Sequence, residues 1–354
     1  MNSQSRYERQ SLLPQIGAVG QKKIAQTTVA IVGIGALGSV SADLLARAGV
    51  GRLRLIDRDS LELNNLQRQV LFDEEDLRKN LPKAVAAQRK LQKINSEIEI
   101  EAEPADLNPE TVDELLEDVH LVVDGTDNFE TRFLMNDFCL REKLPWIYGG
   151  AVGTEGLTYV ILPGVGPCLR CLFEEAPVAG EFETCDTAGI LAPVAHVIAS
   201  FQAIEALKIR AHGHELADRR LWKIDLWKKE FKPINVGTGF PRPAGLGRGD
   251  RAPTPCSGCQ KGDFPYLNRE RASRTITLCG RNAVQIFRSE NRGVDFPNLA
   301  KKLSASGAVT YNEYLLKASI PPFEITLFNN GRAIIQGTQD AGQAKSIYAK
   351  YVGA

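Results

Sequence analysis

Short runs rich in β-branched residues alternate with longer helical stretches between Thr28 and about Gly153, and this alternation constrains the fold more than any other feature. Strands are predicted at residues 28–33, 52–57, 98–103, 120–125 and 146–151, with helices between them at 38–48, 82–94, 109–117 and 129–142. Such alternation implies a parallel sheet with helices on its faces. A strand at 158–164, a helix at 190–211 and antiparallel strands within 221–234 would complete the same sheet. We therefore expect an α/β fold with a Rossmann-like, doubly wound mixed sheet.

The composition changes after this region. Residues 235–265 hold five prolines and seven glycines with little apolar periodicity, which is typical of a linker. Beyond it, we predict strands at 274–280 and 283–288, helices at 296–305 and 340–351, and a hairpin at 323–337 around a two-residue Asn330-Gly331 turn. The expected division is a first domain at 1–240, a linker at 241–265 and a small C-terminal α+β domain at 266–354.

The overall charge excludes some classes of protein. The 354 residues include 43 Lys plus Arg and 43 Asp plus Glu, so the formal charge is zero, which argues against a nucleic-acid or anionic-lipid surface. The first residues lack the pattern of a signal peptide, and no apolar run approaches the ~20 residues of a membrane helix. Seven cysteines, an odd number, argue against a secreted disulfide framework. We expect a cytoplasmic protein without a membrane partner.

A glycine-rich loop lies between the first predicted strand and its helix. Gly33, Gly35 and Gly38 form GxGxxG, a pattern that lets the backbone turn tightly and approach a phosphate at the helix N-terminus. Asp57 ends the next strand, 19 residues after Gly38, where an acidic side chain can hold ribose hydroxyls. This pattern predicts a nucleotide site but does not separate a dinucleotide from ATP, so a nicotinamide-dependent (NAD) oxidoreductase is one alternative.

Further polar residues favour a triphosphate. Asn65 and Arg68 could meet phosphates, because guanidinium groups match phosphate oxygens, and Lys83 follows Pro82 at the start of a predicted helix. Asp127 follows the strand at 120–125, at the carboxyl edge where ligands sit in such sheets, and an acid there suits Mg²⁺. Taken singly, Arg68 and Lys83 read as solvated surface charges, and Asp127 as a helix cap.

Two C-x-x-C pairs suggest a metal site. Cys168 with Cys171 and Cys256 with Cys259 would supply four thiolates for a closed, structural zinc site, although 85 residues separate the pairs. A redox dithiol is the alternative. Cys185 lies in a polar segment before the helix at 190–211, where a helix N-terminus would favour its thiolate, and an incidental thiol is an equal reading.

The chain resembles the ThiF/MoeB/HesA family of the ubiquitin-activating enzyme superfamily from Arg6 to about Cys259. The matching segments are Arg6-Tyr7-x-Arg9-Gln10, the glycine loop, residues 44–57, Asn65-Leu66-Gln67-Arg68-Gln69, Lys83, DGTDN (124–128), CLRC (168–171), TAGILAP (187–193), QAIEALK (202–208) and CSGC (256–259). One departure is Asn80, which stands three residues before Lys83, where members of the family often carry glycine.

The resemblance implies ATP and Mg²⁺ binding in residues 1–240, and adenylation of the C-terminal glycine carboxylate of a ubiquitin-like sulfur-carrier protein. By motif position, Asp57 would hold the ribose, Arg68 and Lys83 would stabilise phosphate charge, Asp127 would bind Mg²⁺, and Arg9 would reach the ATP of a neighbouring subunit in a homodimer. The implied nucleotide-binding residues are Gly33, Gly35, Gly38, Asp57, Asn65, Arg68 and Lys83. The resemblance also favours zinc at the four cysteines, and some members use a cysteine at the position of Cys185 to form an acyl-disulfide with the carrier.

The implied partners are a carrier ending in Gly-Gly, for thiamine or molybdopterin synthesis, and a sulfur donor such as a cysteine desulfurase. We hypothesise that the C-terminal domain helps to dock one of them. The sequence leaves three alternatives open: a tRNA-modifying dehydratase of the same superfamily, the NAD-dependent oxidoreductase, and a non-catalytic scaffold for a ubiquitin-like partner.

Overall fold

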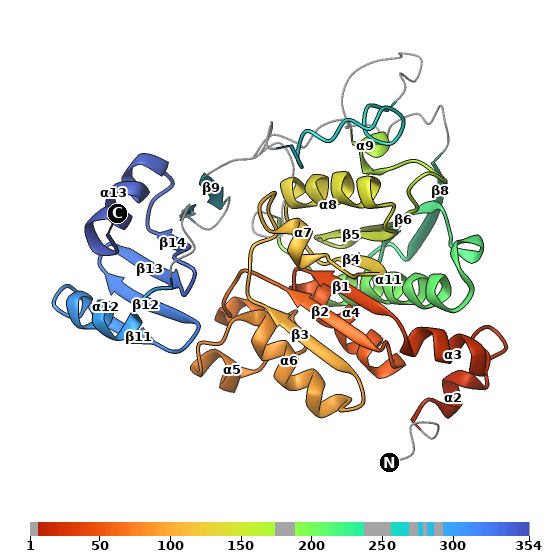
Figure 1. The fold of residues 1–354 in the computed structure, drawn as a ribbon, viewed down its shortest axis with the longest axis horizontal. Helices are drawn as coiled ribbons and strands as arrows, with labels where there is room; N and C mark the ends of the chain where they lie inside the picture. Colours follow the sequence, from red (N-terminus) through yellow and green to blue (C-terminus); the bar gives the residue numbers. More distant parts are fainter. Residues whose placement is uncertain are drawn as a thin grey trace.

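The computed structural model describes residues 6–173, 188–236, 256–268, 275–278, 282–286 and 293–353. An eight-stranded sheet organises the first part, in the order β3-β2-β1-β4-β5-β6-β7-β8 (Figure 1). Its strands are β1 (Thr28–Val32), β2 (Arg52–Ile56), β3 (Glu99–Glu103), β4 (Leu121–Asp124), β5 (Trp146–Val152), β6 (Glu155–Ile161), β7 (Arg220–Asp225) and β8 (Glu230–Asn235). The pairs from β3 to β5 are parallel and those from β5 to β8 antiparallel. The predicted mixed, Rossmann-like sheet is confirmed.

The central strand β1 is buried on both faces. Val29 and Ile31 face one core, while Ala30 and Val32 face another, because successive side chains of a strand point to opposite faces. Helices α3 (Gly17–Ala25), α4 (Ala36–Ala48), α6 (Lys83–Ile94) and α11 (Ala192–His212) contribute to the first core, and α7 (Val112–Leu115), α8 (Phe129–Glu142) and α9 (Leu169–Leu172) to the second. Helix α7 is shorter than the predicted 109–117, and α2 (Glu8–Ser11), α5 (Glu74–Arg78) and two short 3₁₀ turns complete the described elements of this part.

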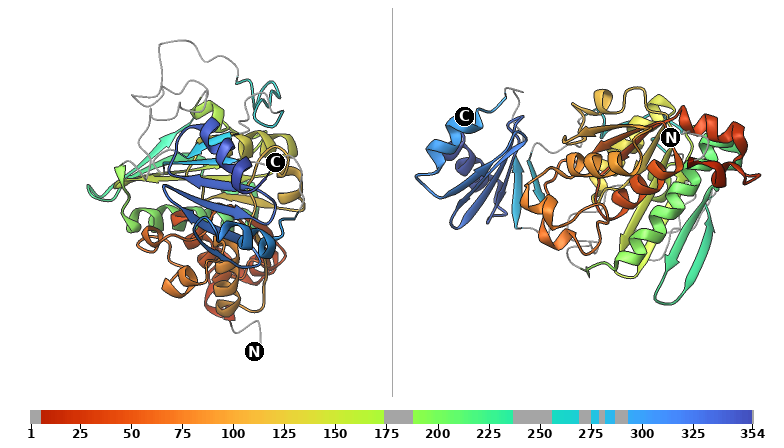
Figure 2. Two further views of the ribbon diagram at one scale, coloured as in Figure 1. Left: turned by 90° about the vertical axis from the view of Figure 1, so that its left-hand side faces the viewer. Right: turned by 90° about the horizontal axis from the view of Figure 1, so that it is seen from below.

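A second sheet forms the C-terminal part, with six antiparallel strands in the order β11-β12-β13-β14-β10-β9. The strands are β9 (Thr275–Leu278), β10 (Ala283–Ile286), β11 (Ala308–Tyr311), β12 (Leu315–Ile320), β13 (Phe323–Phe328) and β14 (Ala333–Gln336). Helices α12 (Phe296–Leu303) and α13 (Ala341–Tyr351) pack on this sheet around a core of their own. Strands β11 and β12 were not predicted. Figure 2 shows this blue unit beside the orange segment that follows β2.

The hairpin of β13 and β14 is one residue longer at its turn than the sequence suggests. The Phe328 N–H donates to the Arg332 carbonyl oxygen at 2.8 Å, so three residues lie in the loop instead of the predicted two. Gly331 takes a φ of +82° there, which accounts for the Asn330-Gly331 signal. The loop delivers Arg332 to the side of the unit that faces the first sheet.

The segment between the two sheets is described only in part. Within it, Tyr266 and Leu267 are buried in the second core of the first sheet. The division into 1–240, 241–265 and 266–354 stays a prediction. Cys185 and most of the expected linker fall outside the described residues. In the part of the chain that is described, no helix has the length and apolar character to cross a membrane.

Candidate functional site

The glycine loop closes tightly between β1 and α4. Gly33 has a φ of +84°, and a Cβ there would lie 2.6 Å from the Gly125 carbonyl oxygen. A Cβ at Gly38 would lie 1.8 Å from the Gly33 carbonyl oxygen, so only glycine lets the helix start this close to the strand. At Gly35, by contrast, the nearest heavy atom to such a Cβ is 3.8 Å away. The loop is therefore packed on its inner side and only partly open at Gly35, which is half-buried and lies beside the first N–H groups of a helix, which have no partner inside the helix.

Asp57 lies directly after β2 and is tied to this loop. One carboxylate oxygen accepts from the Ile34 N–H at 2.6 Å, and the other accepts from the Asp59 N–H at 2.7 Å. Burial raises the pKa of the Asp57 carboxyl, and the nearby Lys83 ammonium offsets part of that rise. The predicted ribose acid is thus held in one position at the edge of the glycine loop.

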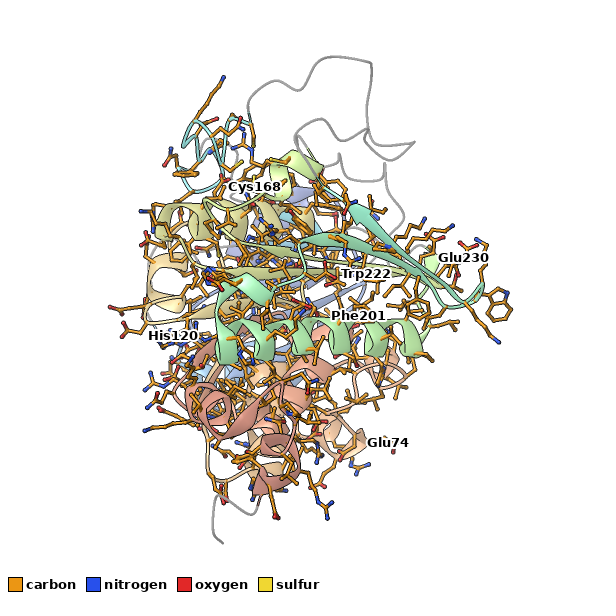
Figure 3. All side chains as sticks on the ribbon, turned by 90° about the vertical axis from the view of Figure 1, so that its right-hand side faces the viewer. Glu74, His120, Cys168, Phe201, Trp222 and Glu230 are labelled. Carbon is orange, nitrogen blue, oxygen red and sulfur yellow. The ribbon has the colours of Figure 1, made fainter. Side chains whose placement is uncertain are left out.

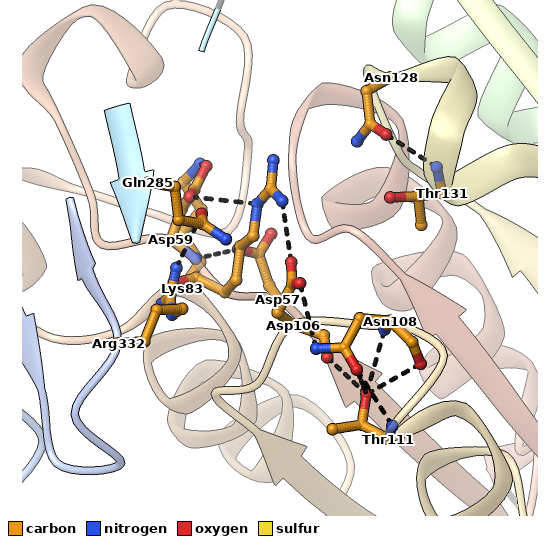
Figure 4. Close-up of polar contacts among 11 residues, drawn as sticks. Asp57, Asp59, Lys83, Asp106, Asn108, Thr111, Asn128, Thr131, Gln285 and Arg332 are labelled. Atoms are coloured by element: carbon orange, nitrogen blue, oxygen red, sulfur yellow. Dashed lines mark hydrogen bonds and ion pairs between the residues drawn. The ribbon is translucent and has the colours of Figure 1, made fainter. Parts of the chain in front are cut away.

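Two ion pairs lie near Asp57, and Figure 4 labels three of their four residues, Asp59, Lys83 and Asp106. The Lys83 Nζ lies 3.4 Å from Asp59, and the Arg58 guanidinium lies 2.8 Å from Asp106. Lys83 is only 4% exposed, so it is no solvated surface charge. Helix α6 begins at Lys83 itself, with Pro82 just before it instead of in its first turn. Arg58, Asp59 and Asp106 were not singled out from the sequence, although each closely follows a predicted strand.

Asn65 and Arg68 turn toward their own segment. Asn65 is buried, and its side chain accepts from the Glu62 N–H at 3.2 Å and donates to the Asn64 side chain at 2.8 Å. Half-buried Arg68 donates to the Asn64 carbonyl oxygen at 2.7 Å. In this conformation both residues shape the turn, and their predicted roles at phosphates stay predictions.

Gln69 ends the segment that matches the family at 65–69, although no role was predicted for it from the sequence, and its side chain lies near the glycine loop. It is 3% exposed, its Oε1 has no partner among the described residues, and its Nε2 lies 3.9 Å from where a Cβ of Gly35 would be. A buried polar atom without a partner is costly, so a ligand in the open loop would have a group to satisfy there.

A buried ion pair holds the loop after β4. The fully buried Asp124 carboxylate accepts from the Arg132 Nε at 2.9 Å, and the same guanidinium donates to the Thr126 and Gly149 carbonyl oxygens at 2.6 and 2.9 Å. The attraction of Asp124 raises the pKa of Arg132 although burial opposes it. Arg132 lies on α8, eight residues after Asp124, and no local pattern in the sequence marks it.

Asp127 lies in that loop and is exposed. It interacts electrostatically with Arg58 and Arg132, so the loop after β4 faces the same edge of the sheet as the end of β2. The cap of α8 is Asn128, whose side chain accepts from the Thr131 N–H at 2.9 Å; reading Asp127 as the cap is therefore wrong. The edge thus gathers an open glycine loop, the buried Lys83 and an exposed acid, which is an arrangement suited to a phosphorylated ligand with a divalent cation.

Arg9 lies at the other end of α4. Its neighbour Gln10 on α2 donates to the carbonyl oxygen of Ala48, the last residue of α4, at 2.9 Å. The glycine loop is at the first residue of this 13-residue helix, about 20 Å away. Exposed Arg9 therefore does not line the glycine loop of its own chain.

The four cysteines of the two C-x-x-C pairs meet in space. Their sulfur atoms all lie within 4.8 Å of one another, and three pairs are 3.5 to 4.0 Å apart. A tetrahedral Zn–S₄ site requires sulfur separations of about 3.8 Å, so the cluster fits a zinc ion. In Figure 3, Cys168 lies in the upper part of the view and Glu74 of α5 in the lower part.

Helix α8 positions both cysteine pairs. The Asn136 side chain accepts from the Leu169 N–H at 2.9 Å, and Asp137 accepts from the Tyr266 N–H at 3.1 Å. Between the pairs, Arg170 donates to the Ser257 Oγ at 2.7 Å. Burial raises the pKa of Asp137 to about 6. These contacts join residues 256–268 to the first sheet.

Comparison with known proteins supports an adenylating enzyme fold. The model of the ThiF family matches residues 7–242. The sulfur carrier protein ThiS adenylyltransferase of Bacillus subtilis is 42% identical over 349 residues, covering 98% of this chain and 99% of that protein. The sulfur carrier protein adenylyltransferase of Thermus thermophilus is 40% identical over 65% of this chain and 86% of that protein. A crystal structure of Escherichia coli MccB with ATP matches with a TM-score of 0.57 and 28% identity, over 66% of this chain and 71% of that one.

Proposed function

Because the chain belongs to the ThiF family, we propose that it is an adenylyltransferase that uses ATP to activate the C-terminal glycine carboxylate of a ubiquitin-like sulfur-carrier protein. The observation that carries the proposal is the likeness to the Bacillus subtilis ThiS adenylyltransferase along almost the whole chain. The buried Lys83 beside the open glycine loop supports it, because a dinucleotide oxidoreductase has no need of that cation. The oxidoreductase alternative accounts for the glycine loop and Asp57 but not for the buried Lys83, and the relatives described above favour a sulfur-carrier adenylyltransferase over the dehydratase.

The chemistry requires positioning and positive charge more than proton transfer. A carboxylate oxygen of the carrier bonds to the α-phosphorus of ATP, while the bond from that phosphorus to the oxygen of the leaving pyrophosphate breaks. The carboxylate is already ionised at neutral pH, so no general base is needed. Lys83 would meet the developing phosphate charge, with Arg68 joining it once its side chain leaves Asn64.

The remaining site residues would hold the nucleotide and its metal. Asp57 would accept from the ribose hydroxyls, and the loop of Gly33, Gly35 and Gly38 would receive the phosphates at the N-terminus of α4. The unpartnered Gln69 Oε1 gives the open loop a polar group for the ligand. Mg²⁺ at Asp127 would supply charge neutralisation beside the phosphates, and Asn65 would act through the turn it shapes.

Arg9, the carrier and the sulfur donor complete the proposal. Since Arg9 lies near the far end of α4 from the glycine loop of its own chain, we propose that it serves the ATP of a second copy in a homodimer. We favour a ThiS-type carrier over a MoaD-type one, because the likeness to the ThiS adenylyltransferase covers 98% of this chain and so includes the C-terminal unit. A cysteine desulfurase would supply the sulfur for the thiocarboxylate, and Cys185 stays a candidate for an acyl-disulfide.

The decisive experiment is ATP–pyrophosphate exchange. We expect exchange with a ThiS-type carrier ending in Gly-Gly, weaker exchange with a MoaD-type carrier, and none with a ThiS-type carrier that lacks the two glycines. Binding of the truncated carrier, followed by calorimetry, separates failed docking from failed chemistry. If folded protein binds ATP but shows no exchange with either intact carrier, the proposed function is wrong.

A zinc ion at the four cysteines makes a separate prediction. Purified protein should hold one zinc per chain, and Cys256→Ser should abolish it and lower stability by about 2 kcal/mol, because residues 256–268 would detach while the sheet remains. Elemental analysis, thermal unfolding and limited proteolysis near residue 260 measure these effects.

Cys139→Ala provides the matched control, since Cys139 is buried in the core outside the cluster. It should destabilise the protein without reducing the zinc content. Full zinc occupancy in Cys256→Ser would contradict the four-cysteine site.

A further inference from the structure

The C-terminal unit reaches into the nucleotide edge of the first sheet. Arg332, on the loop between β13 and β14, is only 2% exposed, and its Nη2 donates to the carbonyl oxygen of Arg58, the residue after Asp57. Its Nη1 donates to the Oε1 of Gln285 on β10 at 3.3 Å. Figure 4 draws Gln285 in the same close-up as Asp59 and Lys83, although Gln285 is about 200 residues further along the chain.

A second contact fixes the same unit against the same segment. The Asn312 Nδ2, between β11 and β12, donates to the Asn80 carbonyl oxygen at 2.9 Å, and Tyr314 packs against the first core. Asn80 has a φ of +49°, so it adopts the left-handed conformation that glycine would take at this position. One contact is made at Arg58 and the other at Asn80, so the C-terminal unit lies along the stretch from Arg58 to Lys83. We call the side of the unit that carries Arg332, Gln285 and Asn312 the wall.

Hydrogen bonding on the inner side of this wall is incomplete among the described residues. Within the described residues, the Arg332 Nε and the Gln285 Nε2 are buried donors without a partner, and Arg332 has no carboxylate within ion-pair distance. Burial lowers the pKa of Arg332 to about 10, although Asp106, Asp59 and Asp57 act in the opposite direction. Buried donors normally have acceptors, so two of them at one edge indicate a ligand with acceptor atoms.

The position of the wall identifies which part of the ligand it meets. In sheets of this kind the phosphates lie at the glycine loop after β1, and the acid after β2 holds the ribose. The base then lies further along the edge, toward β3 and Asp106. Arg332 donates to the carbonyl oxygen of Arg58, the residue directly after the predicted ribose acid Asp57, and this contact places it nearest the nucleoside part of the series.

We propose that Arg332 and Gln285 are nucleotide-binding residues that the C-terminal unit supplies, and that they donate to the ribose oxygens or ring nitrogens of the adenosine half of ATP. This inference rests on the proposed function for the identity of the nucleotide. It gives the C-terminal unit a role in the adenylation site itself, apart from any role in docking the carrier.

The test measures ligand binding by calorimetry on the full chain without a carrier. Arg332→Met should weaken binding of both ATP and AMP roughly 10- to 100-fold, because a charged hydrogen-bond donor is lost, and should leave inorganic tripolyphosphate binding unchanged. Asn312→Ala is the matched control, since it removes a docking contact of the same wall without touching the nucleotide edge. It should change AMP affinity less than about threefold.

Each other outcome overturns the proposal. If Arg332→Met lost equal affinity for AMP and for tripolyphosphate, Arg332 would lie at the phosphates. If Arg332→Met and Asn312→Ala lost equal affinity for AMP, Arg332 would only hold the C-terminal unit in place. Unchanged AMP affinity in Arg332→Met would mean that Arg332 does not contact the nucleotide. Should Arg332→Met not fold, hydrogen exchange of the wild type decides: AMP should slow exchange in the 329–333 loop, and no slowing refutes the contact. Wild-type protein that binds no ATP would instead count against the proposed function.

Discussion

Carrier-dependent ATP–pyrophosphate exchange should fall by roughly 100- to 1,000-fold when Lys83 is replaced by methionine, a change that keeps the length of the side chain and removes its charge. Lys83 is 4% exposed and lies at the first residue of α6, with its Nζ 3.4 Å from Asp59. A cation in such a dry position is fixed before the reaction, so it stabilises negative charge on the phosphates more than a solvated one could. The loss should appear mainly in kcat, because the developing charge is greater in the transition state than in bound ATP.

Lys93→Met is the control for this experiment. Lys93 lies on the same helix but is exposed, so its removal should leave exchange within about twofold of wild type. Circular dichroism and the melting temperature show whether each variant is folded. An exchange rate in folded Lys83→Met close to that of wild type would mean that Lys83 is only the partner of Asp59, and the assignment of the phosphate end of the site would have to change.

The first sheet was predictable because its signals are local and repeated. The central strand β1 is buried on both faces and therefore reads as a nearly continuous apolar run, and the glycines that close the loop on α4 stand directly after this run. The cysteine cluster was predictable for a similar reason, since each pair is a local motif and only their meeting is non-local. Strand β11 escaped detection because it is short and its side chains are mostly exposed, so no apolar pattern marks it.

The burial and the partners of the charged residues at the site could not be predicted from the sequence. Lys83 and Arg68 are both cations near the same edge, yet one is buried against Asp59 and the other bonds its own turn. Burial of a charge depends on which distant segments cover it, and Arg332 belongs to a hairpin about 270 residues after the carbonyl that it contacts. No period or spacing in the sequence encodes that contact, because the two ends meet only through tertiary packing.

The largest loss of stability should follow from replacing Arg132 by leucine. Asp124 is fully buried, and its Oδ2 would lose the Arg132 Nε at 2.9 Å, while the Thr126 and Gly149 carbonyl oxygens would lose their donors. Removing one partner of a buried ion pair leaves an uncompensated charge, which typically costs about 3–5 kcal/mol. Urea unfolding followed by the fluorescence of the buried Trp146 should report that loss in the first sheet.

Two comparisons separate the ion pair from simple loss of packing. Arg141→Leu, at an exposed ion pair on the same helix, should cost no more than about 1 kcal/mol, because water screens such a pair. Adding Asp124→Asn to Arg132→Leu removes the stranded charge, so the double variant should be more stable than Arg132→Leu alone. A double variant less stable than the single one would show that Asp124 is held mainly by the Thr126 N–H and hydroxyl and the Gly149 N–H, which also donate to its carboxylate. The Arg132 guanidinium also fixes the loop that carries Asp127. If Arg132→Leu is stable and keeps full exchange activity, the position of this loop does not matter for catalysis, and the proposed magnesium site at Asp127 is wrong.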